Sequence, residues 1–162
     1  MSTRHLVLVF LFSGLVLANS QKTIGNNFEL PAIFSDHMVL QQKAEVPFWG
    51  KATPQLKISL QASWGASAQA TVQNDSLWQA KLKTPKAGGP YEIKIQIGDS
   101  TIVYKDVLIG EVWLCSGQSN MEMPLEGWPP RDTVAGAAQT IQQAANPDLR
   151  LFTVQRAYSN KP

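Results

Sequence analysis

Hydrophobic and polar residues alternate along the chain from about residue 28 to residue 104. The clearest alternating runs lie at 56–62, 68–73, 78–83 and 91–97. This alternation places apolar side chains on one face of a strand and polar side chains on the other. Turn-forming residues (Asn, Asp, Ser, Gly and Pro) separate the runs. Short strands at this spacing, without a helical period between them, predict an antiparallel β-sandwich.

The pattern changes near Asp106. Residues 107–109 and 112–115 form nearly continuous apolar runs, which are typical of strands covered on both faces. A helical period then predicts a helix over 133–145, with Asp132 or Thr133 as its cap, and a further strand over 149–154. This order of strand, helix and strand is how an α/β domain begins. We therefore expect a β-sandwich domain over 21–106 and the start of an α/β domain over 107–162.

Residues 1–20 have the layout of a cleaved signal peptide. Arg4 and His5 precede an apolar run over 6–18, and small residues follow at 18–20. The alternative is a membrane anchor, but a spanning helix needs about 20 apolar residues and this run is shorter. We expect a mature chain that starts at Gln21, is secreted, periplasmic or (in a eukaryote) lysosomal, and does not bind a membrane after cleavage.

The composition removes several function classes. The chain has 14 basic and 12 acidic residues, a balance that favours neither nucleic acid nor an anionic membrane as a partner. Its single cysteine, Cys115, cannot form an intrachain disulfide. After removal of residues 1–20, one cysteine and one histidine far apart do not predict a metal site, and no motif predicts a cofactor.

Ser119 is the candidate nucleophile. It follows the apolar run at 112–115, and a serine just past the end of a buried strand is well placed to attack a substrate. Met121 stands where the Gly-x-Ser-x-Gly elbow of ordinary α/β-hydrolases has its second glycine. From spacing alone, a capping or turn residue is the alternative role for Ser119.

The segment around this serine resembles a known family. Gly117-Gln118-Ser119-Asn120-Met121, preceded by residues 109–113, is similar to the nucleophile block of sialate O-acetylesterases, which belong to the SGNH hydrolases. Residues 34–42, 46–50, 88–91 and 149–152 resemble the family as well. The resemblance implies a β-sandwich N-terminal domain followed by an SGNH-like α/β (flavodoxin-like) hydrolase domain, of which this sequence holds only the start.

The resemblance also implies a reaction. Ser119 would attack the acetyl carbonyl of an O-acetylated sugar, and its backbone N–H would stabilise the oxyanion. The other oxyanion donors and the histidine base belong to later family blocks that this sequence does not contain. The chain alone is therefore expected to be inactive, and its expected partners are the carbohydrate substrate and the missing C-terminal part of the hydrolase domain.

His37 offers a weaker candidate for catalysis. A triad of Asp36, His37 and Ser119 is unfavourable, because adjacent residues on an extended chain point to opposite faces. A turn or strand edge of the sandwich is the interpretation that we favour for His37.

Two other functions stay open. One is a non-catalytic β-sandwich module that binds glycans through its tryptophans. Of these, we expect Trp49, Trp78 and Trp113 in the core and Trp128 beside a substrate pocket. The other is an acetylesterase that acts on a plant polysaccharide such as acetylated xylan.

Overall fold

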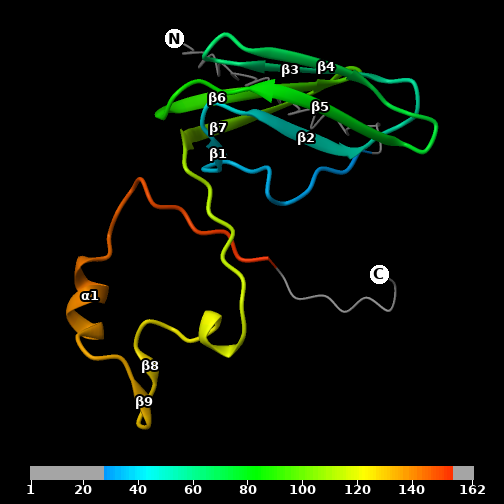
Figure 1. Cartoon of the computed structure of the whole chain (residues 1–162). Helices are drawn as coiled ribbons and strands as arrows, with labels where there is room; N and C mark the ends of the chain where they lie inside the picture. The colour runs from blue at the N-terminus through cyan, green and yellow to red at the C-terminus, as the bar shows by residue number, and fades with distance from the viewer. Residues whose placement is uncertain (1–27, 155–162) are drawn as a thin grey trace, which may run out of the picture.

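Two β-sheets built from the first part of the chain enclose one hydrophobic core (Figure 1). The computed structural model describes residues 28–154, and for Asn120 the backbone alone. The predicted signal peptide lies outside the described residues. The elements are β1 (Val39–Gln41), β2 (Glu45–Lys51), β3 (Lys57–Ala62), β4 (Ser67–Thr71), β5 (Leu77–Lys83), β6 (Gly88–Ile97), β7 (Ser100–Gly110), η1 (Ser119–Met121), β8 (Gly127–Trp128), β9 (Asp132–Thr133) and α1 (Ala137–Gln143).

The larger sheet has the strand order β1-β7-β6-β3-β4, and the smaller one pairs β2 with β5. Most neighbours are antiparallel, as in the β3–β6 pair that sets Leu60 opposite Ile95. The short β1 runs parallel to β7, with Val39 opposite Leu108. The prediction of a mostly β fold for this part of the chain is confirmed.

The alternation of the sequence becomes the alternation of burial. Along β5, every second side chain is buried, including Trp78 and Leu82. Both sheets direct such residues into the same core, where the largest fully buried side chains are Phe48, Ile58, Leu60, Leu82, Ile93, Ile95, Ile97, Val72 and Val107. Because burial of apolar area stabilises by about 25 cal/mol per Å², this core is the main source of stability in the described part of the chain.

Gly50 shows how tightly the edge of the smaller sheet is packed. A Cβ atom at this position would lie 2.4 Å from the carbonyl oxygen of Glu29 and 3.2 Å from the indole nitrogen of Trp78. Glu29 forms an isolated antiparallel bridge with Lys51, which brings its backbone alongside the end of β2. A residue without a side chain is therefore needed where the two segments lie side by side.

Beyond Gly110 the structure differs from the prediction. The strand expected at 107–109 forms, but as the end of β7 in the larger sheet. The strand expected at 112–115 is absent, and Trp113 and Leu114 are 82% and 91% exposed. A strand needs a neighbour for its backbone N–H and C=O groups, and no described strand lies beside this segment.

The predicted helix is shorter than its pattern. It begins after Gly136, whose φ of 75° is left-handed, and covers 137–143 instead of 133–145. Asp132 and Thr133, the expected caps, instead form β9, which pairs with β8. The strand expected at 149–154 is absent, and Leu151 is 89% exposed. The strand at 112–115, the full length of the helix and the strand at 149–154 fail to form for one reason. Most of their apolar side chains have no surface among the described residues to pack against.

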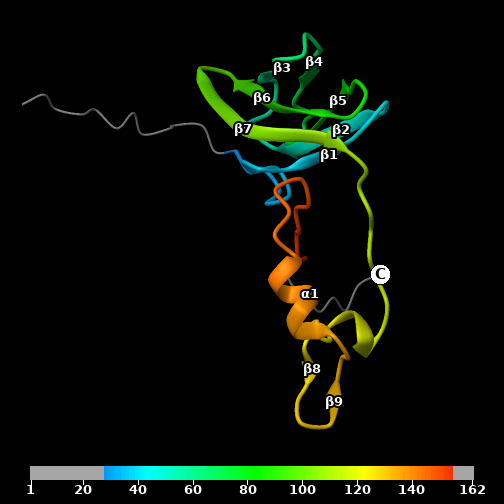
Figure 2. The same ribbon diagram turned by 90° about the vertical axis from the view of Figure 1, so that its left-hand side faces the viewer.

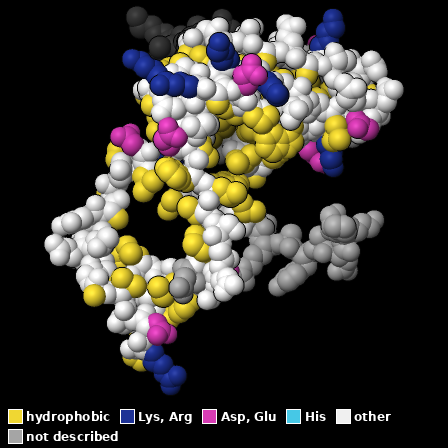
Figure 3. Space-filling model, in the orientation of Figure 1, with side chains coloured by type: hydrophobic (Ala, Val, Ile, Leu, Met, Phe, Trp, Pro, Cys, Tyr) yellow, Lys and Arg dark blue, Asp and Glu magenta, His cyan; other side chains and the backbone are white. Residues whose placement is uncertain are grey.

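The second region therefore extends away from the sheets. In both views η1, β8, β9 and α1 lie apart from them, connected by one outgoing and one returning length of chain (Figure 2). Hydrophobic side chains lie on the segments around the open space between the two regions (Figure 3). None of the helices in residues 28–154 is long and apolar enough to cross a membrane.

Candidate functional site

Ser119 begins η1, a single turn of 3-10 helix, and is exposed. The turn is closed by hydrogen bonds from Met121 N–H to the Gln118 carbonyl (2.9 Å) and from Glu122 N–H to the Ser119 carbonyl (3.0 Å). Neither bond uses the backbone N–H of Ser119, as is usual for the first residue of a helical turn. Within the described residues, no hydrogen bond is found for the Ser119 hydroxyl either. Both groups that the proposed chemistry requires are therefore accessible.

Gly117 has a steric role beside this serine. A Cβ atom on Gly117 would lie 2.7 Å from Cγ of Met121, closer than real contacts allow. The Met121 side chain therefore packs over the backbone at Gly117. The motif Gly-Gln-Ser-Asn-Met folds as a local unit in which the first and last residues contact each other.

The structure places His37 away from any role beside Ser119. His37 lies in a turn with a φ of 66°, as expected from the sequence, and is exposed. Its Nδ1 atom lies 2.5 Å from Oδ2 of Asp106. Asp36, the other candidate, accepts a hydrogen bond from the backbone N–H of Lys105 at 2.7 Å. Asp36 does not orient the His37 ring, and both residues belong to contacts within the β region.

Asp106 is the centre of a polar cluster that the sequence did not reveal. Nη2 of Arg150 donates to both of its carboxylate oxygens, at 3.0 and 2.9 Å, and Nη1 donates to its backbone carbonyl. The hydrogen bond from His37 and then those from Arg150 lower the pKa of the Asp106 carboxyl group. The signal available in the sequence was that 34–42 and 149–152 both resemble one family.

Glu111 is held in a similar way at the end of β7. Its two carboxylate oxygens accept hydrogen bonds from Nε2 of Gln41 (2.9 Å) and Nε2 of Gln42 (2.7 Å). These hydrogen bonds, from Gln41 first and then from Gln42, lower the pKa of the Glu111 carboxyl group. The carboxylate therefore stays ionised near neutral pH.

The tryptophans that are buried in the structure are not all those that the sequence predicted to be in the core. Trp78 is buried as expected, whereas Trp113 is exposed. Trp49 is 40% exposed and packs edge-on against Phe34 at a centroid distance of 4.8 Å. Trp128 is 46% exposed in β8. No described tryptophan lines the pocket beside Phe28 and Glu29.

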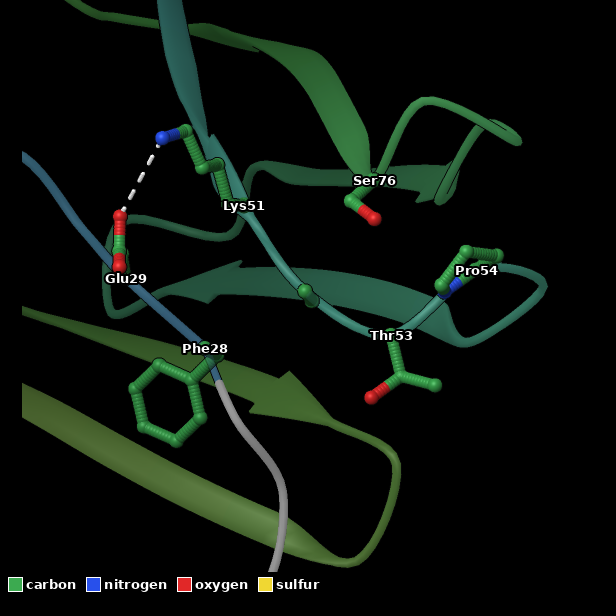
Figure 4. Close-up of a pocket in the computed structure, with 7 residues that line it drawn as sticks. Phe28, Glu29, Lys51, Thr53, Pro54 and Ser76 are labelled. Carbon is green, nitrogen blue, oxygen red and sulfur yellow. Dashed lines mark ion pairs between the residues drawn. The ribbon is translucent and has the colours of Figure 1, made fainter.

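That pocket lies on the β region (Figure 4). It is an open hollow of about 590 Å³ between the segment at Phe28 and Glu29 and the end of β2, where Lys51 Nζ lies 3.5 Å from a Glu29 carboxylate oxygen. None of the residues that line it comes from the segment that carries Ser119. Within the described residues, no group of three or more His, Cys, Asp or Glu could hold a metal ion, and Cys115 is an exposed free thiol.

Similar proteins point to one family. Mouse sialate O-acetylesterase is 28% identical over 158 residues, which is 91% of this chain, and the human enzyme is 32% identical over 114 residues, or 64% of the chain. The curated relatives support the sialate O-acetylesterase family for this chain. It spans 28% and 22% of the lengths of these two relatives.

A solved structure agrees with this similarity. The crystal structure of a carbohydrate acetylesterase from Xanthomonas citri matches this chain with a TM-score of 0.64 and 31% identity. The match covers 74% of this chain and 26% of the bacterial protein. No family model matches the chain.

Proposed function

We propose that this chain is the nucleophile-bearing part of an exported carbohydrate O-acetylesterase, which removes O-acetyl groups from sialic acids or other acetylated sugars. The observation that carries the proposal is the similarity to mouse sialate O-acetylesterase over 91% of the chain. The exposed Ser119 within the Gly-Gln-Ser-Asn-Met motif supports it, because a nucleophile must reach the substrate.

In the proposed reaction the Ser119 oxygen attacks the acetyl carbonyl while a general base accepts the hydroxyl proton. The negative charge that develops on the carbonyl oxygen is stabilised in part by the Ser119 backbone N–H. The sugar leaves with a proton as its free alcohol, and an acetyl group remains on the Ser119 oxygen. Water then hydrolyses this ester and releases acetate. His37 contacts Asp106 within the β region, and the proposal assigns the base to polypeptide outside residues 28–154.

The proposed layout is a signal peptide over 1–20, a β-sandwich over 21–106 and the beginning of an SGNH-like α/β domain from 107. Export follows from the signal peptide. The apolar side chains exposed between 112 and 154 support further layers of structure, since such side chains are normally covered. The chain spans about a quarter of its mouse relative, which leaves room in a family-length enzyme for those layers.

Hydrolysis of acetyl esters by a family-length polypeptide that contains this chain tests the proposal. Ser119→Ala should lower kcat/KM by about 10⁴-fold, since removal of a nucleophile abolishes the covalent route. Ser116→Ala is the matched control, because Ser116 is an exposed serine of the same segment and should leave the rate unchanged. Residues 1–162 alone should show almost no Ser119-dependent hydrolysis. An unchanged rate in Ser119→Ala would refute the assignment of the nucleophile.

The substrate class needs its own comparison. O-acetylated sialic acid and acetylated xylan are offered to the same family-length polypeptide, and acetate release is measured. Preference for sialic acid supports a sialate O-acetylesterase in the strict sense. Preference for xylan supports the broader activity named for the bacterial relative. Binding of either glycan without any hydrolysis would favour the non-catalytic glycan-binding module.

A further inference from the structure

The segment that carries Ser119 leaves the β region through a set of glutamine contacts. The side chain of Gln41 accepts a hydrogen bond from Val112 N–H through Oε1 (2.9 Å) and donates to Glu111 through Nε2 (2.9 Å). Gln42 donates to the second oxygen of Glu111 at 2.7 Å. The direction of the chain just after β7 is thus set by three hydrogen bonds to two adjacent side chains.

The same segment returns to the β region at Arg150. The guanidinium group of Arg150 contacts both the carboxylate and the carbonyl of Asp106, which lies 44 residues earlier. The Arg150 side chain is 19% exposed and that of Asp106 is 39% exposed, so water screens the guanidinium side of this pair less than in an ordinary surface pair. The contact also fixes orientation, because Nη2 donates to the carboxylate of Asp106 while Nη1 donates to its backbone carbonyl.

Both attachment points belong to one small platform, which we define as residues 36–42 together with 105–111. Its two halves are joined by the parallel pairing of β1 with β7. Backbone hydrogen bonds from His37 to Lys105 (3.0 Å) and from Gln42 to Gly110 (2.8 Å) extend this pairing at both ends. The platform is therefore part of the larger sheet and shares its stability.

We infer that this platform fixes both ends of the segment 112–149, and that Asp106 and Glu111 are positioning residues for Ser119. The anchoring stands on the contacts alone, whereas the positioning role rests on the proposed function of Ser119. The physical reason is that a reacting atom displaced by about 1 Å can cost about 100-fold in rate. A segment tied at both ends also has fewer conformations available than one tied at a single end.

Hydrogen exchange on the full chain tests the anchoring. Asp106→Asn removes the charge that Arg150 contacts while keeping a residue that tolerates the left-handed φ of 53° at this position. Glu111→Gln removes the charge that the two glutamines contact. Amides between 112 and 149 should exchange roughly twofold to tenfold faster in each variant. Amides of β3 and β6 serve as an internal reference and should not change.

Matched controls are available in the same chain. Asp99→Asn and Glu126→Gln change the same groups at exposed positions outside the platform, and should leave exchange between 112 and 149 as it is. If Asp106→Asn also speeds exchange in β3 and β6, the sheet itself has loosened, and Arg150→Ala decides the question without altering β7. Unchanged exchange in Asp106→Asn, Glu111→Gln and Arg150→Ala would overturn the anchoring.

Hydrolysis by the family-length polypeptide tests the positioning role. Asp106→Asn should lower kcat by about tenfold to 100-fold with little change in KM, because the substrate still binds while Ser119 is misplaced. Arg150→Lys should retain more activity than Arg150→Ala, since it keeps the charge beside Asp106. If kcat is unchanged although exchange is faster, the anchoring holds and the positioning role is wrong. If Ser119→Ala has no effect, the proposed function fails and the exchange result still stands.

Discussion

The two parts of the described chain use apolar residues in opposite ways. In residues 28–110, Leu60 is fully buried between two neighbouring strands. In residues 111–154, Leu114 is 91% exposed and lies in no sheet. The two positions have the same side chain, but Leu60 lies in an alternating run between Ser59 and Gln61, whereas Leu114 lies in a continuous apolar run between Trp113 and Cys115. The difference shows that an apolar pattern yields an element only where a second surface is available to cover it.

Backbone hydrogen bonding explains why the two parts differ so sharply. Every strand of the larger sheet has at least one neighbour within the described residues, so its N–H and C=O groups are paired when its side chains are buried. The segment at 112–115 has apolar side chains on both faces and no neighbouring strand. A two-faced strand requires two covering layers, whereas an alternating strand requires one.

The largest expected effect compares the two leucines directly. Leu60→Ala should lower the free energy of unfolding by about 2–5 kcal/mol, since it removes buried methyl groups and leaves a cavity. Leu114→Ala should change it by less than about 0.5 kcal/mol, because the side chain has few neighbours to lose. Urea unfolding followed by circular dichroism measures both. A comparable loss in Leu114→Ala would mean that residues 111–154 are packed in solution.

A smaller loss of stability is expected where the segment at Glu29 lies beside β2. Gly50→Ala should destabilise the fold by about 1–3 kcal/mol, because the new methyl group would overlap the Glu29 carbonyl. Gly110→Ala is the control at the end of β7, where the nearest atom would be Cγ1 of Val39 at an ordinary 3.7 Å. The same urea titration applies. Equal effects of the two substitutions on the free energy of unfolding would show that Glu29 does not pack closely against Gly50.

The smallest effect concerns the platform that joins the two parts. The pKa of Asp106 and that of Glu111 are lower in the folded protein than their ordinary values. The carboxylates therefore contribute fully above about pH 4, the usual range of unfolded acids, and the contribution is lost as the pH falls through the lowered values. Protection factors of amides at 112–149 should stay level between about pH 8 and pH 5 and fall below about pH 4.

The double variant Asp106→Asn/Glu111→Gln separates these two groups from the other acids of the chain. It should have lower protection at neutral pH and lose less of it in acid than the unchanged protein. Identical acid profiles in the two proteins would mean that other carboxylates hold the segment.

Much of the β region could be predicted from residues alone. The run at 78–83 alternates strictly, and β5 buries Trp78, Ala80 and Leu82 as that pattern requires. The candidate serine could also be predicted, from its motif and its resemblance to a family. The polar cluster could not, because Asp106 and Arg150 are 44 residues apart and each looks like an ordinary charged residue.

The sequence by itself therefore determined the β strands of residues 28–110, the faces that they bury and the family that the chain resembles. These features depend on periodicity and on local motifs, which are properties of neighbouring residues. Only the tertiary structure decided that residues 107–109 form the end of β7 in the larger sheet, that 112–115 stay exposed and that Asp106 accepts hydrogen bonds from Arg150. Those outcomes depend on which distant surfaces meet, and the pattern of apolar and polar residues along the sequence does not specify which residues come into contact.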